Sequence, residues 1–279
     1  MVAQTIQLPN IRQMIIPDPG YIMCDCDLAQ ADAQVVAWEA NDDELKYIFK
    51  NGLDLHLANA AAIFKLPFGL EELHDPVFVD MAKEKYKKFR DRSKAGVHAT
   101  NYGASAFTLA VALGITKKEA EKFIDDWFTA HPGIADWHLK VENDLQTKRM
   151  VTNQFGNRKL FFGRLDNAFP EALAWIPQST VALIISHAML NTAREVPECQ
   201  MLFQVHDSLI FQLPYRTYRR SLRAMENCFK VVVPYEDELI IPAGPAVSRK
   251  SWGDVKDCGW DGKWADPKIA ELARTGTVI

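Results

Sequence analysis

The acidic residue Asp207 lies in the middle of an apolar run, where a carboxylate needs a physical explanation. Residues 201–213 read MLFQVHDSLIFQL, which predicts two short β-strands joined by a tight turn around Asp207. Removing a carboxylate from water at the tip of such a hairpin is unfavourable unless a positive charge lies beside it, and a divalent metal ion would meet that need. Taken alone, the segment is better interpreted as an ordinary polar turn.

A second pair of carboxylates lies near the N-terminus, in the segment Tyr21–Asp27. Its residues predict a strand that carries Asp25 and Asp27 on one face, with Cys24 and Cys26 on the other. A stretch of helix-forming composition follows, so the strand ends in a carboxylate. Two aspartates from strands far apart in the sequence could hold two Mg²⁺ ions about 3.5–4 Å apart for in-line phosphoryl transfer. Mg²⁺ suits a site with few carboxylates, because substrate phosphates complete its octahedron.

The third feature is an ordered row of cationic and aromatic side chains. The stretch from Lys83 to Lys94 holds seven basic residues against two acidic ones, and Arg90, Lys94, His98 and Tyr102 follow one another at intervals of four. On an α-helix they lie along one slowly rotating face about 18 Å long. Arginine and lysine bind phosphates, and a ring can stack on a base, so this row could run along a nucleotide. For the basic stretch alone, a solvated helix face is the simpler interpretation.

Together these segments resemble the polymerase core of the A-family DNA polymerases, the group that contains bacterial DNA polymerase I and many phage replicases. The matching segments are residues 27–34 (DLAQADAQ) for the first motif, Arg90, Lys94 and Tyr102-Gly103 for the second, and residues 204–207 (QVHD) for the third. Residues 52–56 (GLDLH) are similar to the family's Asp-Ile-His segment, and residues 177–180 (PQST) to its minor-groove helix. The segments keep the family's order over residues 10–252.

The resemblance implies a role for each matching residue. Asp27 and Asp207 would be the catalytic carboxylates, and together with the backbone carbonyl of Leu28 they would hold two Mg²⁺ ions, for which Mn²⁺ could substitute. The expected nucleotide-binding residues are His56, Arg90, Lys94, His98, Tyr102, Asp32 and Gln30. The expected DNA-binding residues are Gln178, Arg158, Lys159 and His206. The substrates implied are dNTPs and primer–template DNA.

Several positions depart from the family pattern. Ser208 replaces the glutamate that usually follows the third-motif aspartate, which leaves one fewer acidic group at the metals. Asp32 replaces the glutamate that blocks the sugar 2′-hydroxyl, His98 replaces an aromatic Phe or Tyr, and Gln34 replaces an arginine. The arginine and asparagine expected upstream of Gln178 are missing. These changes bear on fidelity and sugar selection more than on the two-metal chemistry.

The predicted fold is α+β, a polymerase palm with a helical insertion. The palm, an antiparallel sheet with helices, comprises residues 1–40 and 150–255. Helical fingers occupy residues 41–149 and contain the nucleotide-binding helix at about 85–112, while residues 256–279 form a loop-like tail. The local signals are a helix start at Asp42, a capping Thr116-x-x-Glu119, a break at His131-Pro132-Gly133, a hairpin turn at residues 155–158 and packing tryptophans at Trp260 and Trp264.

Few residues precede Asp27, so the thumb and exonuclease domains of the family are expected to be absent. We therefore expect a separate chain that supplies the thumb, with or without an exonuclease. Its expected docking site is the apolar run made by Leu8, Ile11, Met14, Ile15 and Ile16.

The composition is compatible with this reading. The formal net charge is -4, which argues against a general DNA-coating protein but allows a basic DNA track beside an acidic metal site. No signal peptide and no 18-residue apolar stretch are apparent, so we expect no membrane partner. The five cysteines show no zinc spacing and are expected to be free thiols in a reducing compartment, the cytoplasm of a bacterium or of a phage-infected host.

The sequence therefore predicts a template-directed DNA polymerase core that adds dNTPs to a primer 3′ end during DNA replication. Two alternatives remain open. One is a non-catalytic descendant that binds DNA or a replisome partner, favoured by Ser208 and by the missing thumb. The other is a single-subunit RNA polymerase, which Asp32 opposes because such enzymes need a small residue beside the ribose hydroxyl.

Overall fold

The computed structural model describes residues 10–165 and 167–263, and its chain divides into two compact units. The sheet unit contains residues 1–31, 181–233 and 240–279, and the helical unit contains residues 32–180 and 234–239. The boundaries expected from the sequence, at residues 40 and 150, differ from these. Residues 32–40 and 150–180 associate with the helices rather than with the sheet.

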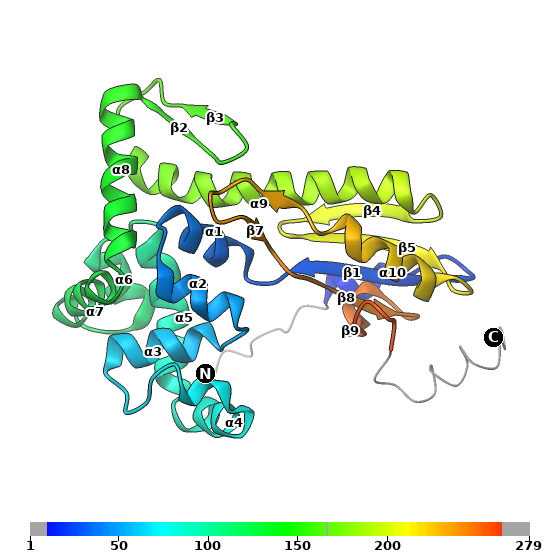
Figure 1. Ribbon diagram of the computed structural model, residues 1–279, viewed down its shortest axis with the longest axis horizontal. Helices are drawn as coiled ribbons and strands as arrows, with labels where there is room; N and C mark the ends of the chain where they lie inside the picture. Colours follow the sequence, from blue (N-terminus) through cyan, green and yellow to red (C-terminus); the bar gives the residue numbers. More distant parts are fainter. Residues whose placement is uncertain (1–9, 166, 264–279) are drawn as a thin grey trace, which may run out of the picture. The chain divides into compact units, whose positions relative to one another are not determined.

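The sheet unit is built on a five-stranded antiparallel sheet with the order β4-β5-β1-β8-β9 (Figure 1). Its strands are β1 (Tyr21–Leu28), β4 (Gln200–Val205), β5 (Ser208–Pro214), β8 (Ala243–Ser248) and β9 (Lys256–Asp257). The predicted first strand and the predicted hairpin are therefore both present. They are neighbours in the sheet, with β1 at its centre.

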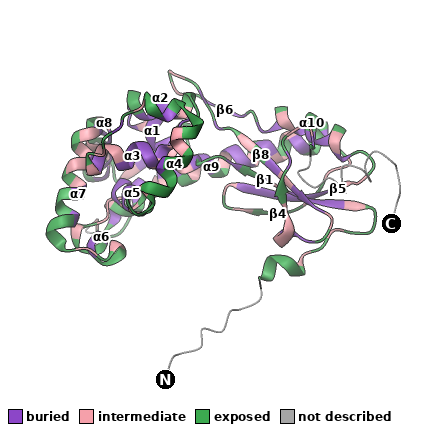
Figure 2. Cartoon of the chain, turned by 90° about the horizontal axis from the view of Figure 1, so that it is seen from below, coloured by how far each residue is buried: buried purple, intermediate pink, exposed green. Residues whose placement is uncertain are grey.

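The two faces of β1 have different surroundings, as its alternation predicts. Ile22, Cys24 and Cys26 are fully buried, and Figure 2 shows how much of β1 and β8 is buried. Helix α10 (Tyr218–Cys228) lies beside β5. The opposite face carries Met23, which packs with Ile210 and Trp252 under the short helices η1 (Ile11–Met14) and η3 (Trp252–Asp254).

The tail contributes to the sheet unit as far as it is described. Cys258 is buried, and the Trp260 indole N–H donates to the Ala243 carbonyl at 3.0 Å while its ring lies 5.7 Å from that of Phe229. Trp260 is thus a packing residue, as expected. Trp264 and the rest of the tail, like Leu8 at the other end of the chain, lie outside the described residues.

The helical unit contains α1 to α8 and a small hairpin. The helices are α1 (Ala31–Glu39), α2 (Asp43–Lys50), α3 (Leu55–Phe64), α4 (Pro76–Lys85), α5 (Lys87–Asn101), α6 (Ala106–Leu113), α7 (Lys117–Ala130) and α8 (Pro132–Lys148), with the short η2 (Glu72–His74) between α3 and α4. The hairpin is β2 (Met150–Thr152) and β3 (Arg158–Leu160). Two further short strands, β6 (Val232–Val233) and β7 (Leu239–Ile240), form a separate pair and are not part of this hairpin. The predicted helical insertion is confirmed.

Local signals set the helix ends. The Asp42 carboxylate accepts the Leu45 N–H at 2.9 Å at the start of α2, and Thr116 and Glu119 form a reciprocal capping box on α7. The expected nucleotide-binding helix at 85–112 is wrong in its extent. Helix α5 ends at Asn101, because Gly103 adopts a left-handed conformation with φ +73°. Helix α6 is a separate helix that begins at Ala106.

Helix α9 (Ala168–Glu195) is longer than the sequence indicates, because its 28 residues run through Pro177. Contrary to the expectation that no such stretch occurs, an 18-residue window of α9 has a mean hydropathy of 1.4, enough in length and composition to cross a membrane. One such helix is a weak sign of a membrane span, because core helices pass the same test. Leu173, Ile176, Ile184 and Ile185 are buried, which gives α9 a core-facing stripe.

Candidate active site

The sheet unit brings the two predicted catalytic aspartates together. Asp27 is the penultimate residue of β1 and lies opposite Ser208, the first residue of β5. Asp207 occupies the turn before β5, where His206 adopts a positive φ of +52°. The Leu28 N–H donates to the Asp207 carbonyl at 3.1 Å, which ties the end of β1 to this turn. Backbone pairing between distant segments therefore fixes the two carboxylates side by side.

Asp27 and Asp207 line a pocket of about 300 Å³ within the sheet unit. Its lining consists of Arg12, Asp25, Asp27, Val205, His206, Asp207, Ser208, Gly244, Ala246 and Asp257. The residues paired with the Asp27 end of β1 are small, so the floor beneath the carboxylates is open. A Cβ added at Gly244 would meet no atom within 4 Å.

The electrostatics of this pocket favour a cation. Partial burial and the neighbouring negative charges of Asp207 and Asp25 together raise the pKa of Asp27 to about 6, against the opposing effect of the Arg12 charge. Like-charged carboxylates held this close resist ionisation together, and a divalent ion between them would remove the repulsion.

The donor set fits Mg²⁺ only as a site that substrate completes. Among the described residues, no group of three or more His, Cys, Asp and Glu side chains is arranged to hold a metal ion. Two carboxylates and a backbone carbonyl at Leu28 are hard oxygen ligands, and Mg²⁺ commonly takes one or two carboxylates together with phosphates and water. The hypothesis of Mg²⁺ bound together with nucleotide therefore agrees with the chemistry of these residues.

The helical unit assembles the predicted triphosphate-binding side chains on α3 and α5. Arg90 binds the Asp54 carboxylate with two nitrogens, Nε to Oδ1 at 3.2 Å and Nη2 to Oδ2 at 3.0 Å. Asp54 also caps α3 by accepting the Leu57 N–H at 2.9 Å. Burial opposes ionisation of Asp54, yet its pKa is lowered because Arg90 and that N–H bind the charged form. The guanidinium is thereby held in one orientation.

His56 lies within reach of the same cations. The Ser93 hydroxyl donates to the His56 carbonyl at 2.8 Å, which joins α3 to α5 beside Arg90. Burial lowers the pKa of His56, and the positive charges of Arg90 and Lys94 lower it further, against the effect of Asp54. The structure thus places three of the predicted nucleotide-binding residues together, with a surplus of positive charge.

The aromatic end of the row meets the predicted sugar gate. The rings of His98 and Tyr102 are in edge contact, with centroids 4.6 Å apart. The Tyr102 hydroxyl donates to the Asp32 carboxylate at 2.8 Å, and burial together with Asp32 raises the pKa of Tyr102. Asp32 lies in the first turn of α1, and Gln30, with φ +48°, forms the turn before that helix. The hydrogen bond to Asp32 was not foreseen in the sequence.

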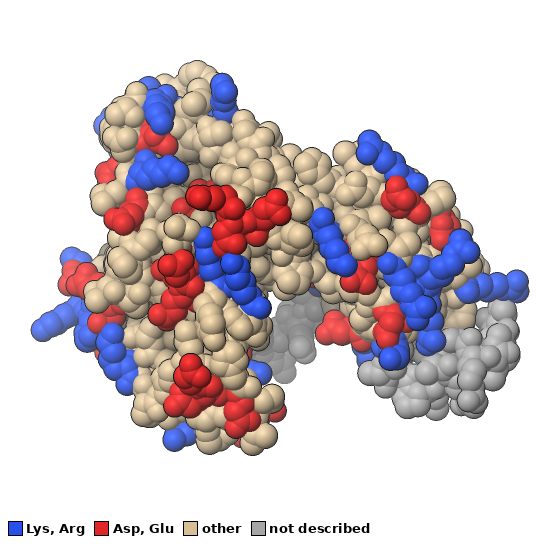
Figure 3. All heavy atoms as spheres, viewed as in Figure 1, with Lys and Arg blue, Asp and Glu red and all other residues tan. Residues whose placement is uncertain are grey.

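The predicted DNA-contacting residues differ in their exposure and in their partners. Arg158 is exposed on β3 and Gln178 is exposed on α9, while Lys159 is paired with Glu171 at 2.6 Å. Because Glu171 is 58% exposed, this ion pair is weak and leaves Lys159 able to bind a phosphate. Figure 3 shows acidic and basic side chains intermixed over the helical unit, while Lys and Arg gather on the part of the sheet unit that carries α10.

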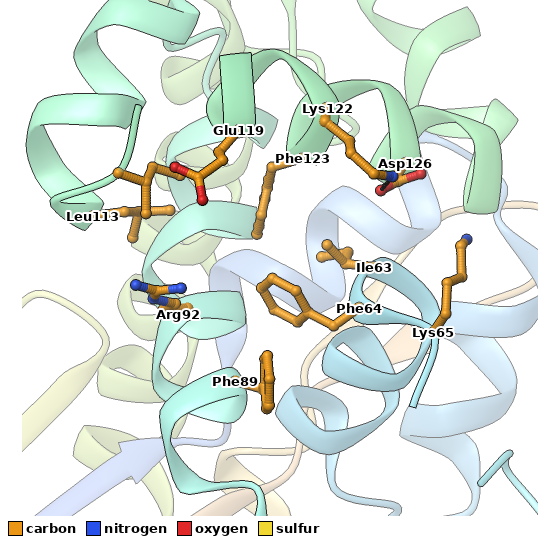
Figure 4. Close-up of a pocket in the computed structure, with 11 residues that line it drawn as sticks. Ile63, Phe64, Lys65, Phe89, Arg92, Leu113, Glu119, Lys122, Phe123 and Asp126 are labelled. Carbon is orange, nitrogen blue, oxygen red and sulfur yellow. Dashed lines mark hydrogen bonds and ion pairs between the residues drawn. The ribbon is translucent and has the colours of Figure 1, made fainter. Parts of the chain in front are cut away.

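A second cavity is lined by residues of α3, α5 and α7, among them Phe64, Phe89 and Phe123 (Figure 4). Its volume is about 310 Å³, and its base is made of Ile63, Phe64, Phe89 and Phe123. Gly96 brings α5 against α7 here, because a Cβ at that position would come within 2.4 Å of the Phe123 ring. Phe89, Arg92 and Gly96 are spaced three and four residues apart, so the sequence could have indicated that a second face of α5 packs against other helices.

Sequence reasoning missed several residues that shape the carboxylate pocket. Arg12 stacks over the Trp252 ring at 4.5 Å, and the Trp252 indole N–H donates to Asp25 at 2.6 Å. Asp257 lies opposite Ala246. The alternation of β1 placed Asp25 on the face of Asp27 but gave no sign of these partners, which come from both ends of the chain.

The fold is that of a polymerase domain. The structure matches that of the POL domain of Pol1 from M. smegmatis in complex with DNA primer-template and dNTP, with a TM-score of 0.72 over 93% of this chain and 44% of that chain, at 23% sequence identity. The sequence model of DNA polymerase family A matches residues 3–243. This chain therefore belongs to DNA polymerase family A.

Individual relatives agree with this assignment. The chain is 31% identical to DNA polymerase I of Chloroflexus aurantiacus over 84% of its length and 29% identical to the thermostable DNA polymerase I of Thermus filiformis over 82%. It is 25% identical to the DNA polymerase of Mycobacterium phage D29 over 91%. The chain spans 24%, 28% and 39% of these three proteins, respectively.

Proposed function

We propose that this chain carries the nucleotidyl-transfer site of a DNA-directed DNA polymerase, which extends a primer 3′ end with dNTPs in DNA replication. In this proposal the sheet unit is the palm and the helical unit the fingers. The observation that carries it is the proximity of Asp27 and Asp207 at the ends of neighbouring strands, where the charge of Asp207 contributes to the raised pKa of Asp27. Family membership supports it.

Asp27, Asp207 and the Leu28 carbonyl would hold Mg²⁺, or Mn²⁺ in its place. When bound, such ions activate the primer 3′-hydroxyl and neutralise charge on the phosphates of the nucleotide. The protein's own contribution is to hold the two carboxylates close together, beside small residues that leave the pocket open. The hydrogen bond from Leu28 to Asp207 holds the separation of the two strand ends.

Arg90, Lys94 and His56 would bind the triphosphate. Asp54 orients the Arg90 guanidinium before substrate arrives, so less side-chain freedom is lost on binding. Because the pKa of His56 is lowered, its imidazole is neutral at pH 7 and would donate a hydrogen bond to a phosphate without adding charge. Tyr102 and Asp32 would contact the new base pair and the sugar.

Primer–template DNA would lie against Arg158, Gln178 and His206. Affinity for DNA depends on the number of phosphates that the protein neutralises. We propose that a second chain, one that carries a thumb, docks on the apolar surface where Ile11, Met14 and Ile16 are 70%, 76% and 67% exposed.

Single-turnover incorporation tests this function. Lys94→Ala should lower kcat/KM for dNTP at least tenfold with little change in affinity for primer–template, because the lost charge faces the nucleotide. Lys88→Ala removes the same charge from an exposed position on another face of α5 and serves as the control. Equal effects of the two variants, or a loss confined to DNA affinity, would mean that α5 contacts the DNA backbone. DNA binding without any incorporation by the wild-type chain would favour a non-catalytic descendant.

A further inference from the structure

Asp25 presents a buried carboxylate oxygen without a partner beside the candidate metal site. Its Oδ2 accepts the Trp252 indole N–H at 2.6 Å. Its Oδ1 is buried and has no hydrogen-bond partner among residues 10–165 and 167–263. An unsatisfied buried carboxylate oxygen is destabilising, and proteins rarely retain one without a function. Asp25 also lines the pocket of Asp27 and Asp207, so its carboxylate lies beside the space where cations would bind.

The register of the sheet places Asp25 next to the position of the missing family glutamate. Asp27 lies opposite Ser208, and Asp25 lies opposite Ile210, so Asp25 and Ser208 are diagonal neighbours on one face of the sheet. Such neighbours are separated by about 7–8 Å, within reach of a carboxylate-bearing side chain. A glutamate at position 208 and an aspartate at position 25 would therefore bring negative charge to the same region.

The surroundings leave this region open to cations. On the other side of β1, Asp27 is paired with Gly244 and Asp25 with Ala246, and neither side chain fills the pocket. The Trp252 indole fixes the orientation of Asp25 through its N–H, and Trp252 is itself covered by the Arg12 guanidinium at 4.5 Å. The hydrogen bond from Trp252 thus restricts the Asp25 side chain to one rotamer.

We propose that Asp25 supplies to the metal site the carboxylate that Ser208 lacks. Asp25 acts as a positioning residue that strengthens cation binding at Asp27 and Asp207 through the negative charge of its carboxylate. The inference rests on the proposed function, because it presumes that those two aspartates bind the ions.

Binding of Mn²⁺ alone to the purified chain, without DNA or nucleotide, tests the inference by electron paramagnetic resonance titration. Asp25→Asn keeps the size of the side chain and its acceptor for Trp252, and it should weaken Mn²⁺ binding about tenfold, as loss of an outer carboxylate typically does. Asp80→Asn, which neutralises an 83% exposed carboxylate on α4, is the matched control and should leave affinity unchanged. Affinity within twofold of wild type in Asp25→Asn would overturn the inference.

Ser208→Glu separates this role from a purely structural one. In the Asp25→Asn background it should restore most of the lost Mn²⁺ affinity, whereas alone it should change affinity less than twofold, because Asp25 already supplies the charge. Failure to restore affinity, or a tenfold gain in the single variant, would overturn the inference, and the single variant is informative even if Asp25→Asn does not fold. Asp207→Asn distinguishes the two proposals. If Asp207→Asn abolishes Mn²⁺ binding and Asp25→Asn leaves the affinity unchanged, only the inference about Asp25 fails. If neither variant changes the affinity for Mn²⁺, the proposed function fails as well.

Discussion

Removing the Tyr102 hydroxyl should loosen the exclusion of ribonucleotides. Asp32 is one methylene shorter than the family's usual glutamate, yet its carboxylate is held by the Tyr102 hydroxyl at 2.8 Å. A shorter side chain that is fixed in place can still occupy the volume beside the sugar 2′ position. Tyr102→Phe leaves the ring and its edge contact with His98 but frees Asp32 to rotate away.

The size of the effect follows from the kind of hydrogen bond that is lost. A bond between a hydroxyl and a carboxylate contributes roughly 1.5–3 kcal/mol, and partial exposure of this pair favours the lower end. A free energy of about 1.4 kcal/mol corresponds to a tenfold change in an equilibrium constant. Tyr102→Phe should therefore lower the preference for dNTP over rNTP by up to about tenfold. Asp32→Ala should lower it further, because it removes the blocking volume itself.

The assay is single-nucleotide primer extension, with kcat/KM measured separately for a dNTP and for the matching rNTP. Tyr86→Phe, which deletes a hydroxyl at the start of the same helix, controls for nonspecific effects. If Tyr102→Phe keeps the wild-type ratio while Asp32→Ala changes it, the hydrogen bond does not hold the gate. If neither variant changes the ratio, another residue excludes the ribose hydroxyl.

Three further perturbations have defined outcomes. Because the pKa of Asp27 is raised from 3.8 to about 6 in the folded chain, stability falls as pH rises through that interval, and Asp27→Asn should have a higher Tm than wild type in EDTA at pH 7.5 but an equal Tm near pH 3.5. The pKa of Asp54 is lowered instead, so its contribution is present above pH 3.8 and lost on acidification, and Asp54→Asn should flatten the decline in Tm between pH 5 and pH 3. Gly133→Ala should destabilise the chain by roughly 1–3 kcal/mol in urea titrations, despite the higher helix propensity of alanine, because the new Cβ would lie 2.5 Å from the Ala40 carbonyl oxygen. A Tm of Asp27→Asn below that of wild type in EDTA, an unchanged acid limb for Asp54→Asn, or a neutral Gly133→Ala would each contradict the corresponding reasoning.

Local chemistry made much of the fold predictable. The alternation of residues 21–28 placed Asp25 and Asp27 on one face, and the apolar run with Asp207 at its centre gave the hairpin. The capping pair Thr116 and Glu119 marked the start of α7. Each of these signals depends on neighbours a few positions away, so it can be read from the sequence alone.

The parts that were missed depend on contacts between distant segments. The spacing of residues in the sequence does not predict the register that places Asp27 opposite Ser208 in the β1–β5 pair. It also does not predict the hydrogen bond that the Trp252 indole N–H donates to Asp25. The ion pair between Lys159 and Glu171, on another element, was likewise not foreseen, and the prediction that Lys159 contacts DNA stays a prediction. Such partners are fixed only when the chain has folded, and residue type alone cannot supply them.

Helix α9 shows the limit of local rules most clearly. A proline inside a helix costs about 3 kcal/mol or more, so Pro177 predicts a helix end. The helix nevertheless continues, because Leu173, Ile176 and Val181 on both sides of the proline are buried. Fully burying a large aliphatic side chain contributes about 1.5–3 kcal/mol, so three of them outweigh the proline. The same stripe explains why α9 is apolar enough to resemble a membrane span.

The central claim is that Asp27 and Asp207 perform metal-dependent nucleotide addition, and the most direct test is primer extension by Asp207→Asn. The assay should use excess purified chain at low salt, because affinity for nucleic acid falls steeply as the salt concentration rises. With Mg²⁺ the wild-type chain should extend the primer, while Asp207→Asn, which keeps shape but loses charge, should be slower by orders of magnitude with DNA affinity within about twofold of wild type. Asp80→Asn should extend like wild type. Extension by Asp207→Asn at the wild-type rate would contradict the claim.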